Sequence, residues 1–150
     1  MKLKDIILTE LKYQDGMKNE FGKLINVKYS GGILEFQTPR VIIVNIDEKY
    51  ITLQLTGTEA CKTFYLKILE LESNFTSHFK NKIKTIFKIS NFVVKIPKNG
   101  LTVIKQGMLF NYHHLTVGME IICLVSIQTI WITNEINYNL TVKEILIKDT

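Results

Sequence analysis

Alternating apolar and polar residues in this chain predict several short β-strands. The clearest case is Tyr50–Thr56, in which every second residue from Ile51 is aliphatic and the intervening residues are Thr or Gln. This alternation places the aliphatic side chains on one face of a strand. Clusters of β-branched and aromatic residues predict the other strands at Leu24–Tyr29, Ile33–Phe36, Val41–Val44, Phe92–Ile96 and Leu101–Lys105.

Two short segments have the composition of turns between these strands. Gly31-Gly32 separates the first two, and glycine reaches positive φ without steric cost, so these strands are expected to form a hairpin. Pro97-Lys98-Asn99-Gly100 separates Phe92–Ile96 from Leu101–Lys105, which are expected to pair as well.

One segment has helical rather than strand periodicity. From Cys61 to Phe75, apolar residues recur every three or four positions, which predicts an amphipathic helix over about Thr58–His78. Thr58 is the expected N-cap, and Glu59 is an acid in the first turn, where the helix dipole favours negative charge.

The C-terminal part carries the longest strand signals, Glu120–Thr133 and Tyr138–Lys148, separated by four residues. If those four residues close a hairpin, Thr133 faces Tyr138 across the strands. In that register Trp131 and Tyr138 project from the same face.

These elements predict a mostly β fold with one main α-helix. Short strands, a single helix midway and a long closing hairpin favour a five-stranded Greek-key barrel of the OB type. At 150 residues, without an internal repeat or a linker composition, residues 1–150 are expected to form one domain.

Charge is distributed unevenly along the chain. The 47 residues from Ser73 to Met119 contain seven lysines and no acid, whereas Met1–Glu72 is neutral and the net charge of the whole chain is +5. Such a concentration of positive charge is typical of a surface that binds a polyanion, most often nucleic acid. An ordinary solvated face is the simpler alternative.

Aromatic residues are interleaved with these lysines. Binding of a single strand needs cations along the phosphates and flat rings on which bases stack, and the sequence offers both. Lysine neutralises phosphate without the bidentate geometry that distinguishes guanine, so low sequence specificity is expected. The candidate binding residues are Arg40, Lys82, Lys84, Lys88, Phe92, Lys95, Lys98, Lys105, Tyr112, Trp131 and Tyr138. For Arg40, a surface ion pair with Asp47 or Glu48 is an equal alternative. For the aromatic residues, the alternative is a position in the hydrophobic core.

Several short motifs resemble those of a known family. They are Phe36-Gln37-Thr38-Pro39 before a strand, the alternating stretch from Tyr50, Phe64 with Leu69-Glu70 in the helix, Lys95-Ile96-Pro97, and the late Ile130-Trp131. In these motifs and in the order of elements, the chain resembles the OB-fold single-stranded DNA-binding proteins of nucleocytoplasmic large DNA viruses (African swine fever virus type), over about residues 28–147. The resemblance implies a viral protein that binds single-stranded DNA in replication, repair or recombination.

Catalysis is not expected. A metal-dependent nuclease needs carboxylates gathered at the phosphate, and the basic stretch has none. His113-His114 lacks neighbouring ligands, so neither a metal nor a cofactor is predicted. The main alternative to DNA binding is a protein-interaction or structural OB module, or an RNA binder, whose basic face docks an acidic partner.

Nothing in the chain predicts secretion or a membrane span. The longest purely apolar run is Ile121–Val125, and Cys61 and Cys123 are isolated, which favours a reducing intracellular setting. If the viral resemblance holds, the protein is expected at replication sites in the host cytoplasm or nucleus. The sequence leaves open a homo-oligomer, a replication-protein partner, and the choice between DNA and RNA.

Overall fold

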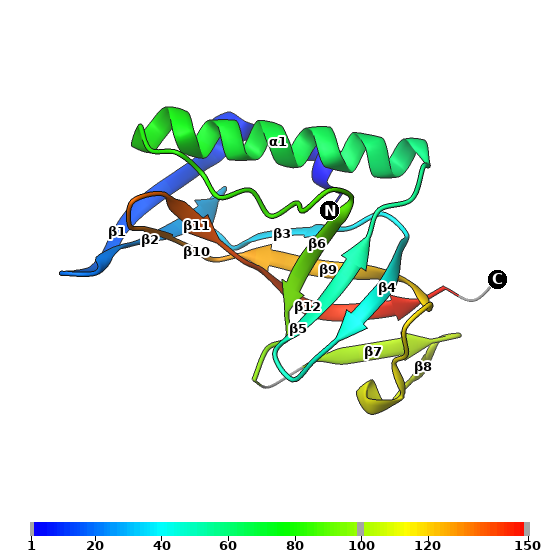
Figure 1. The fold of residues 1–150 in the computed structure, drawn as a ribbon. Coiled ribbons are helices and arrows are strands. Elements are labelled where there is room, and N and C mark those ends of the chain that lie inside the picture. The colour runs from blue at the N-terminus through cyan, green and yellow to red at the C-terminus, as the bar shows by residue number, and fades with distance from the viewer. Residues whose placement is uncertain (1, 99–100, 149–150) are drawn as a thin grey trace.

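The computed structural model describes residues 2–98 and 101–148 of the chain (Figure 1). Strands account for 48% and helices for 21%, so the fold is mostly β with one main helix. The elements are η1 (Leu3–Asp5), η2 (Leu8–Glu10), β1 (Leu11–Asn19), β2 (Gly22–Tyr29), β3 (Leu34–Gln37), β4 (Val41–Ile46), β5 (Tyr50–Gln54), α1 (Glu59–Phe79), β6 (Asn91–Lys95), β7 (Thr102–Lys105), β8 (Met108–Leu109), η3 (Tyr112–His114), β9 (Glu120–Ile127), β10 (Thr129–Ile132), β11 (Ile136–Tyr138) and β12 (Leu140–Ile147).

Five of these strands close into a barrel. β4 pairs with β5, β5 with β6, β6 with β12, β12 with β9, and β9 returns to β4. The β6–β12 pair is parallel, whereas the other four pairs of the ring are antiparallel. A closed five-stranded barrel with one main helix is consistent with an OB-like fold, so the predicted fold class is confirmed.

Alternation along each strand fills the barrel. Ile51 and Leu53 of β5 are fully buried, and so are Val94 of β6 and Val142 of β12. Each such side chain contributes about 1.5–3 kcal/mol by leaving water, so this core is the main stabilising term.

The predicted helix is confirmed as α1. Thr58 is its N-cap, and its side chain accepts a hydrogen bond from the backbone N–H of Cys61 at 3.2 Å. At the other end Lys80 adopts the left-handed conformation, and its N–H donates to the carbonyl oxygen of Thr76. The apolar face packs against the barrel through Phe64, whose ring lies 5.5 Å from that of Phe92.

A second, four-stranded sheet extends from the barrel, in the order β1-β2-β10-β11 (Figure 1). In the sequence, the hairpin β10–β11 lies between the barrel strands β9 and β12. β10 also pairs with β2, which joins the hairpin to β1 and β2 in this sheet. α1 covers one face of this sheet, where Phe75 contacts Tyr13 of β1 and Tyr138 of β11 at centroid distances of 6.0 and 5.5 Å.

Two predicted hairpins are wrong. The Gly31-Gly32 turn forms, with mutual hydrogen bonds between Tyr29 and Gly32, but β2 and β3 then separate into different sheets. β6 and β7 do not pair with each other, because both lie parallel to β12 along one of its edges. In the predicted turn between them, Asn99 and Gly100 lie outside the described residues.

The long C-terminal hairpin forms in a different register from the predicted one. Trp131 faces Asn137, and Ile130 faces Tyr138. The turn is tighter than expected, since the N–H of Thr133 donates to the carbonyl oxygen of Glu135 at 3.0 Å. Side chains alternate between the two faces of a strand, so Trp131 and Tyr138 lie on opposite faces of the sheet, not on the same one.

Candidate nucleic-acid interface

Trp131 lies at the centre of the sheet face that points away from α1. Its neighbour Ile130 is fully buried, and so is Ile136, which identifies the side of these strands that packs into the core. The intervening residues Trp131 and Asn137 therefore lie on the other side. The same alternation places Leu24 of β2, which is paired with Trp131, on this face. Trp131 itself is half-buried.

The loop between α1 and β6 extends this sheet by a fifth, strand-like segment. Ile83 forms a parallel bridge with Ile136, with N–H···O distances of 2.9 Å from Lys84 to Ile136 and 2.7 Å from Ile136 to Lys82. Ile83 packs against the core, whereas Lys82 and Lys84 are exposed. The two lysines therefore share a side of this segment, and it is the side of Trp131.

Lysines also lie on the opposite flank of Trp131. Lys12 of β1 and Lys28 of β2 are directly paired across the strands, at positions that the alternation assigns to the same face. Like charges in this arrangement destabilise a sheet. An anion bound between them would remove that repulsion.

We name this surface the Trp131 face. It comprises Lys12, Gln14, Leu24, Asn26, Lys28, Lys82, Lys84, Thr129, Trp131 and Asn137. All of these residues belong to the described part of the chain, and none of them carries a carboxylate. Within that part, none of its four lysines makes an ion pair. The surface is therefore a tryptophan ring with uncompensated positive charge on both sides.

The face continues onto the outer wall of the barrel. Along β11 and β12 every second side chain from Ile136 to Val142 is buried, so Asn139 and Thr141 point outward like Asn137. Thr141 is paired with Lys95 of β6, which in turn is paired with Tyr50 of β5. In OB barrels the face of the second and third strands, here β5 and β6, is the usual site for oligonucleotides.

A buried carboxylate holds the lysine-bearing loop in place. Glu72 of α1 is only 4% exposed, and its Oε2 accepts hydrogen bonds from the Thr85 hydroxyl at 3.0 Å and the Ile86 N–H at 3.1 Å. The hydroxyl of Tyr138 donates to the same oxygen. Burial raises the pKa of Tyr138 well above its usual value, and the charge and hydrogen bond of Glu72 raise it further. This network fixes the loop that presents Lys82 and Lys84.

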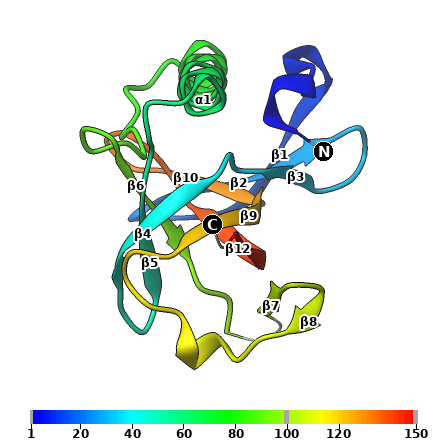
Figure 2. The ribbon, with the colours of Figure 1, turned by 90° about the vertical axis from the view of Figure 1, so that its right-hand side faces the viewer.

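The structure brings several predicted binding residues together. Lys82, Lys84 and Trp131 belong to the Trp131 face, and Lys95 lies on its continuation. Lys88 is exposed in the tight turn that leads into β6, where it is bonded to Asn91, and Lys98 is exposed just beyond that strand. The loop between α1 and β6 lies with β6 on the left-hand side of the molecule in Figure 2.

Phe92 and Tyr138 cannot serve as stacking platforms, and their prediction as such is wrong. Phe92 is 1% exposed inside the barrel, because its position on β6 alternates with the outward Val93. Tyr138 is 5% exposed beneath α1, where its ring contacts Phe75. Neither ring has a free face for a base.

Lys105 and Tyr112 belong to a separate part of the molecule. Lys105 is on β7, and Tyr112 is in η3, which lie at the end of the barrel remote from α1 (Figure 1). The ammonium group of Lys105 lies over the ring of Phe110, 5.4 Å from its centroid. Lys105 and Tyr112 are therefore not part of the Trp131 face.

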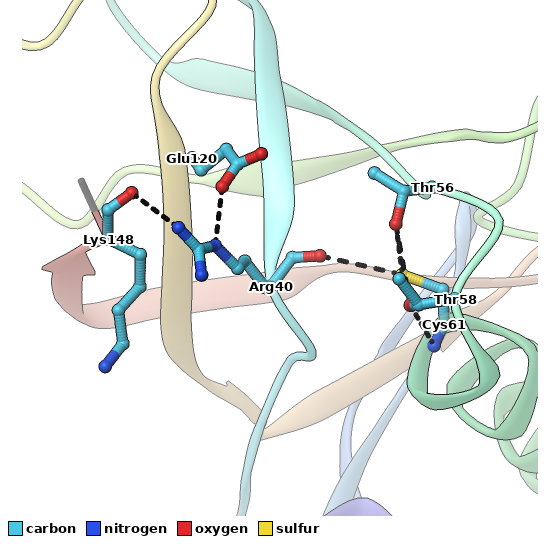
Figure 3. A network of polar contacts seen from close by, with 6 residues as sticks. All are labelled: Arg40, Thr56, Thr58, Cys61, Glu120 and Lys148. Atoms are coloured by element: carbon cyan, nitrogen blue, oxygen red, sulfur yellow. Dashed lines mark hydrogen bonds and ion pairs between the residues drawn. The ribbon is translucent and has the colours of Figure 1, made fainter. Parts of the chain in front are cut away.

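Arg40 has a structural partner different from those predicted. Its Nε lies 2.5 Å from a carboxylate oxygen of Glu120, and its Nη2 donates to the carbonyl oxygen of Lys148 at 3.2 Å (Figure 3). Its own carbonyl oxygen accepts a hydrogen bond from the Cys61 thiol at 3.6 Å. Arg40 therefore links the start of β4 to β9, to the end of β12 and to α1. The alternative of an ion pair with Asp47 or Glu48 is wrong, because the partner is Glu120.

Sequence reasoning missed Lys12, Lys28 and Glu72. The two lysines lie in the part of the chain with no net charge, and β1 has almost no buried residue to mark it as a strand. The sequence could have indicated a buried Glu72, because this residue follows Leu71 on the buried face of α1 and directly precedes the acid-free stretch.

Within residues 2–98 and 101–148, no group of three His, Cys, Asp or Glu side chains could hold a metal ion. No helix in this same part of the chain is long and apolar enough to cross a membrane. No protein-family model matches the chain, and no curated protein sequence matches it either.

Proposed function

We propose that this protein binds single-stranded DNA without sequence specificity, through the Trp131 face and its continuation onto β6. The observation that carries the proposal is the half-buried tryptophan ring with lysines on both flanks and no carboxylate among the residues of the face. Base stacking on an aromatic ring and phosphate contacts to lysine are the two parts of single-strand recognition.

The geometry favours a single strand over a duplex. A ring on a sheet is accessible to a base only if that base is unstacked from its neighbours. Five adjacent segments, from β1 to the Lys82–Lys84 segment, span about 19 Å at a strand spacing of about 4.8 Å. Lysines at both margins of that width can follow the phosphates of a strand that crosses over Trp131. We further propose, from the resemblance to the viral proteins, that the DNA is an intermediate of viral replication, repair or recombination.

Tryptophan fluorescence titrated with oligo-dT across a salt series tests the proposal, with duplex DNA as the control. Four to six lysine contacts predict a log–log salt slope of about −3 to −4, at roughly −0.7 per contact. Quenching with that slope and weak duplex binding supports the function. Oligo-U in place of oligo-dT tests RNA as the ligand. Absence of binding to either oligonucleotide at about 50 mM salt excludes the proposal, because electrostatic binding is strongest at low salt.

A further inference from the structure

A cleft on the other side of the molecule has a different character from the Trp131 face. It lies between the N-terminal half of α1 and η1, above the segment that joins β3 to β4, and has a volume of about 390 Å³. In Figure 2, α1 and the N-terminal 3-10 turns stand as two separate walls above β3. Clefts of about 300–1,000 Å³ are the usual size for bound ligands.

The floor of this cleft is apolar. Leu3 of η1 and Phe64 of α1 line it and are 3% and 4% exposed, and Ile122 of β9 completes it. Phe64 makes ring contacts with Phe36, Phe87 and Phe92, so its ring is held in the core. With no ring face free, the cleft offers no stacking platform for a base. Its floor suits an aliphatic or aromatic side chain.

The rim of the cleft is positive. Lys2 and Lys4 flank the buried Leu3, are exposed, and form no ion pair with any described residue. Arg40 lies at the opposite end, paired with Glu120. The one acid on the rim, Glu59, is already bonded to Lys62 at 3.3 Å. The uncompensated charge around the cleft is therefore that of the two N-terminal lysines.

We propose that this cleft docks an acidic peptide segment of a partner protein, with one bulky apolar side chain of the segment seated on Leu3, Phe64 and Ile122. The carboxylates on either side of that residue face Lys2 and Lys4. The proposal commits to a peptide because the two walls come from separate elements, so an extended chain can lie between them, and because the charge of the rim is complementary to acidic side chains.

Docking here leaves the proposed DNA site free. The cleft lies on the η1 side of α1, whereas the lysine-bearing loop passes along the opposite side of the helix (Figure 2). The Trp131 face points away from α1 altogether. The protein can therefore hold its partner and a single strand at the same time. This inference does not depend on the proposed function.

The test is an NMR titration of the full ¹⁵N-labelled chain with the peptide Asp-Glu-Leu-Phe-Asp-Glu, and with Asp-Glu-Ser-Ser-Asp-Glu as the control peptide. We expect the first peptide to shift the amide signals of Leu3, Ala60, Thr63 and Ile122, and the control to bind at least tenfold more weakly. Lys4→Glu is expected to weaken binding about fivefold, since exposed charge pairs are individually weak. Thr63→Trp, which fills the cleft from an exposed position, is expected to abolish it. Lys18→Glu, an equal charge change at an exposed site on β1, leaves binding unchanged.

Three outcomes overturn the proposal. One is the absence of shifts at millimolar peptide. Another is equal binding of both peptides, which shows a response to charge alone. The third is displacement of the peptide by saturating oligo-dT, or shifts confined to the Trp131 face, which place the peptide at the DNA site. Binding of oligo-dT itself is measured separately, so failure of the cleft and failure of the DNA-binding function give different results.

Discussion

The hydroxyl of Tyr138 donates a hydrogen bond to the buried carboxylate of Glu72, which joins β11 to α1. The same carboxylate oxygen accepts from Thr85 and Ile86 in the loop that carries Lys82 and Lys84. One side chain thus sets the positions of a helix, a strand and a basic loop relative to one another.

Removal of the Glu72 carboxylate is expected to destabilise the fold strongly. Glu72→Ala leaves the buried Tyr138 hydroxyl and the part-buried Ile86 N–H and Thr85 hydroxyl without this acceptor, and an unsatisfied buried group costs about 1–3 kcal/mol. We expect a loss of about 3 kcal/mol or more in urea unfolding, against roughly half that loss for Glu72→Gln, which keeps an acceptor oxygen. Amide hydrogen exchange at Ile86 should accelerate in both variants. An equal loss for Ala and Gln would contradict an acceptor role.

Alkaline pH is expected to destabilise the protein. Burial raises the pKa of the Cys123 thiol to about 12, although a hydrogen bond with Thr38 acts in the opposite direction, and burial raises the pKa of Tyr138 as well. Both groups stay protonated in the folded chain while the unfolded chain loses its protons near pH 9 and 10. Their contribution to stability is therefore complete below pH 9 and declines above it. Urea unfolding from pH 8 to 11 measures this decline, and Tyr138→Phe should reduce the part of it that begins near pH 10.

Truncation of Trp131 is expected to weaken binding of oligo-dT. Loss of one stacked base costs about 1–3 kcal/mol, which is about 5- to 150-fold in affinity. Trp131→Phe keeps a ring and should retain most of the affinity. Because the side chain is half-buried, thermal unfolding of both variants serves as the control for folding. Unchanged affinity of a folded Trp131→Ala variant would remove this residue from the site.

Neutralisation of Lys82 and Lys84 is expected to act on the salt dependence. Loss of two phosphate contacts should reduce the magnitude of the log–log slope by about 1.4, at roughly 0.7 per contact. The matched control is Lys62→Gln with Lys67→Gln on α1, where both lysines are paired with glutamates, Glu59 and Glu70. The control should retain the slope of the unmodified protein. An equal change in both double variants would indicate net charge rather than a site.

Local sequence patterns predicted the elements better than their partners. The period of α1 and the alternation of β5 are properties of short segments, and both are confirmed. β3 pairs with β9, and β7 pairs with β12 as well as with the adjacent β8. β9 and β12 lie far along the chain, and no local pattern in β3 or β7 indicates pairing with them. β1 was missed, since only Leu11 is buried and only Tyr13 is partly buried among its nine residues, which gives no apolar period to detect.

The binding site was predictable only in part, for a related reason. The lysines at residues 80–98 were visible in the composition of the chain. Whether Trp131 and Tyr138 share a face depends on the register of the hairpin. A shift of the pairing by an odd number of residues moves Tyr138 to the face opposite Trp131. Lys12 and Lys28 come together only through the pairing of β1 with β2.

The parallel pairing of β6 with β12 has a kinetic consequence. The barrel is a closed ring only after residues 140 and 141 have reached residues 94 and 95, which lie far back along the chain. Closing such a long loop lowers the chain entropy before the stabilising contacts form, so proteins rich in distant strand pairings fold slowly. Until β12 docks, β6 and β9 each retain an open edge, and such edges readily pair with other chains. The protein is therefore most prone to aggregation during folding, in the interval before β12 closes the barrel.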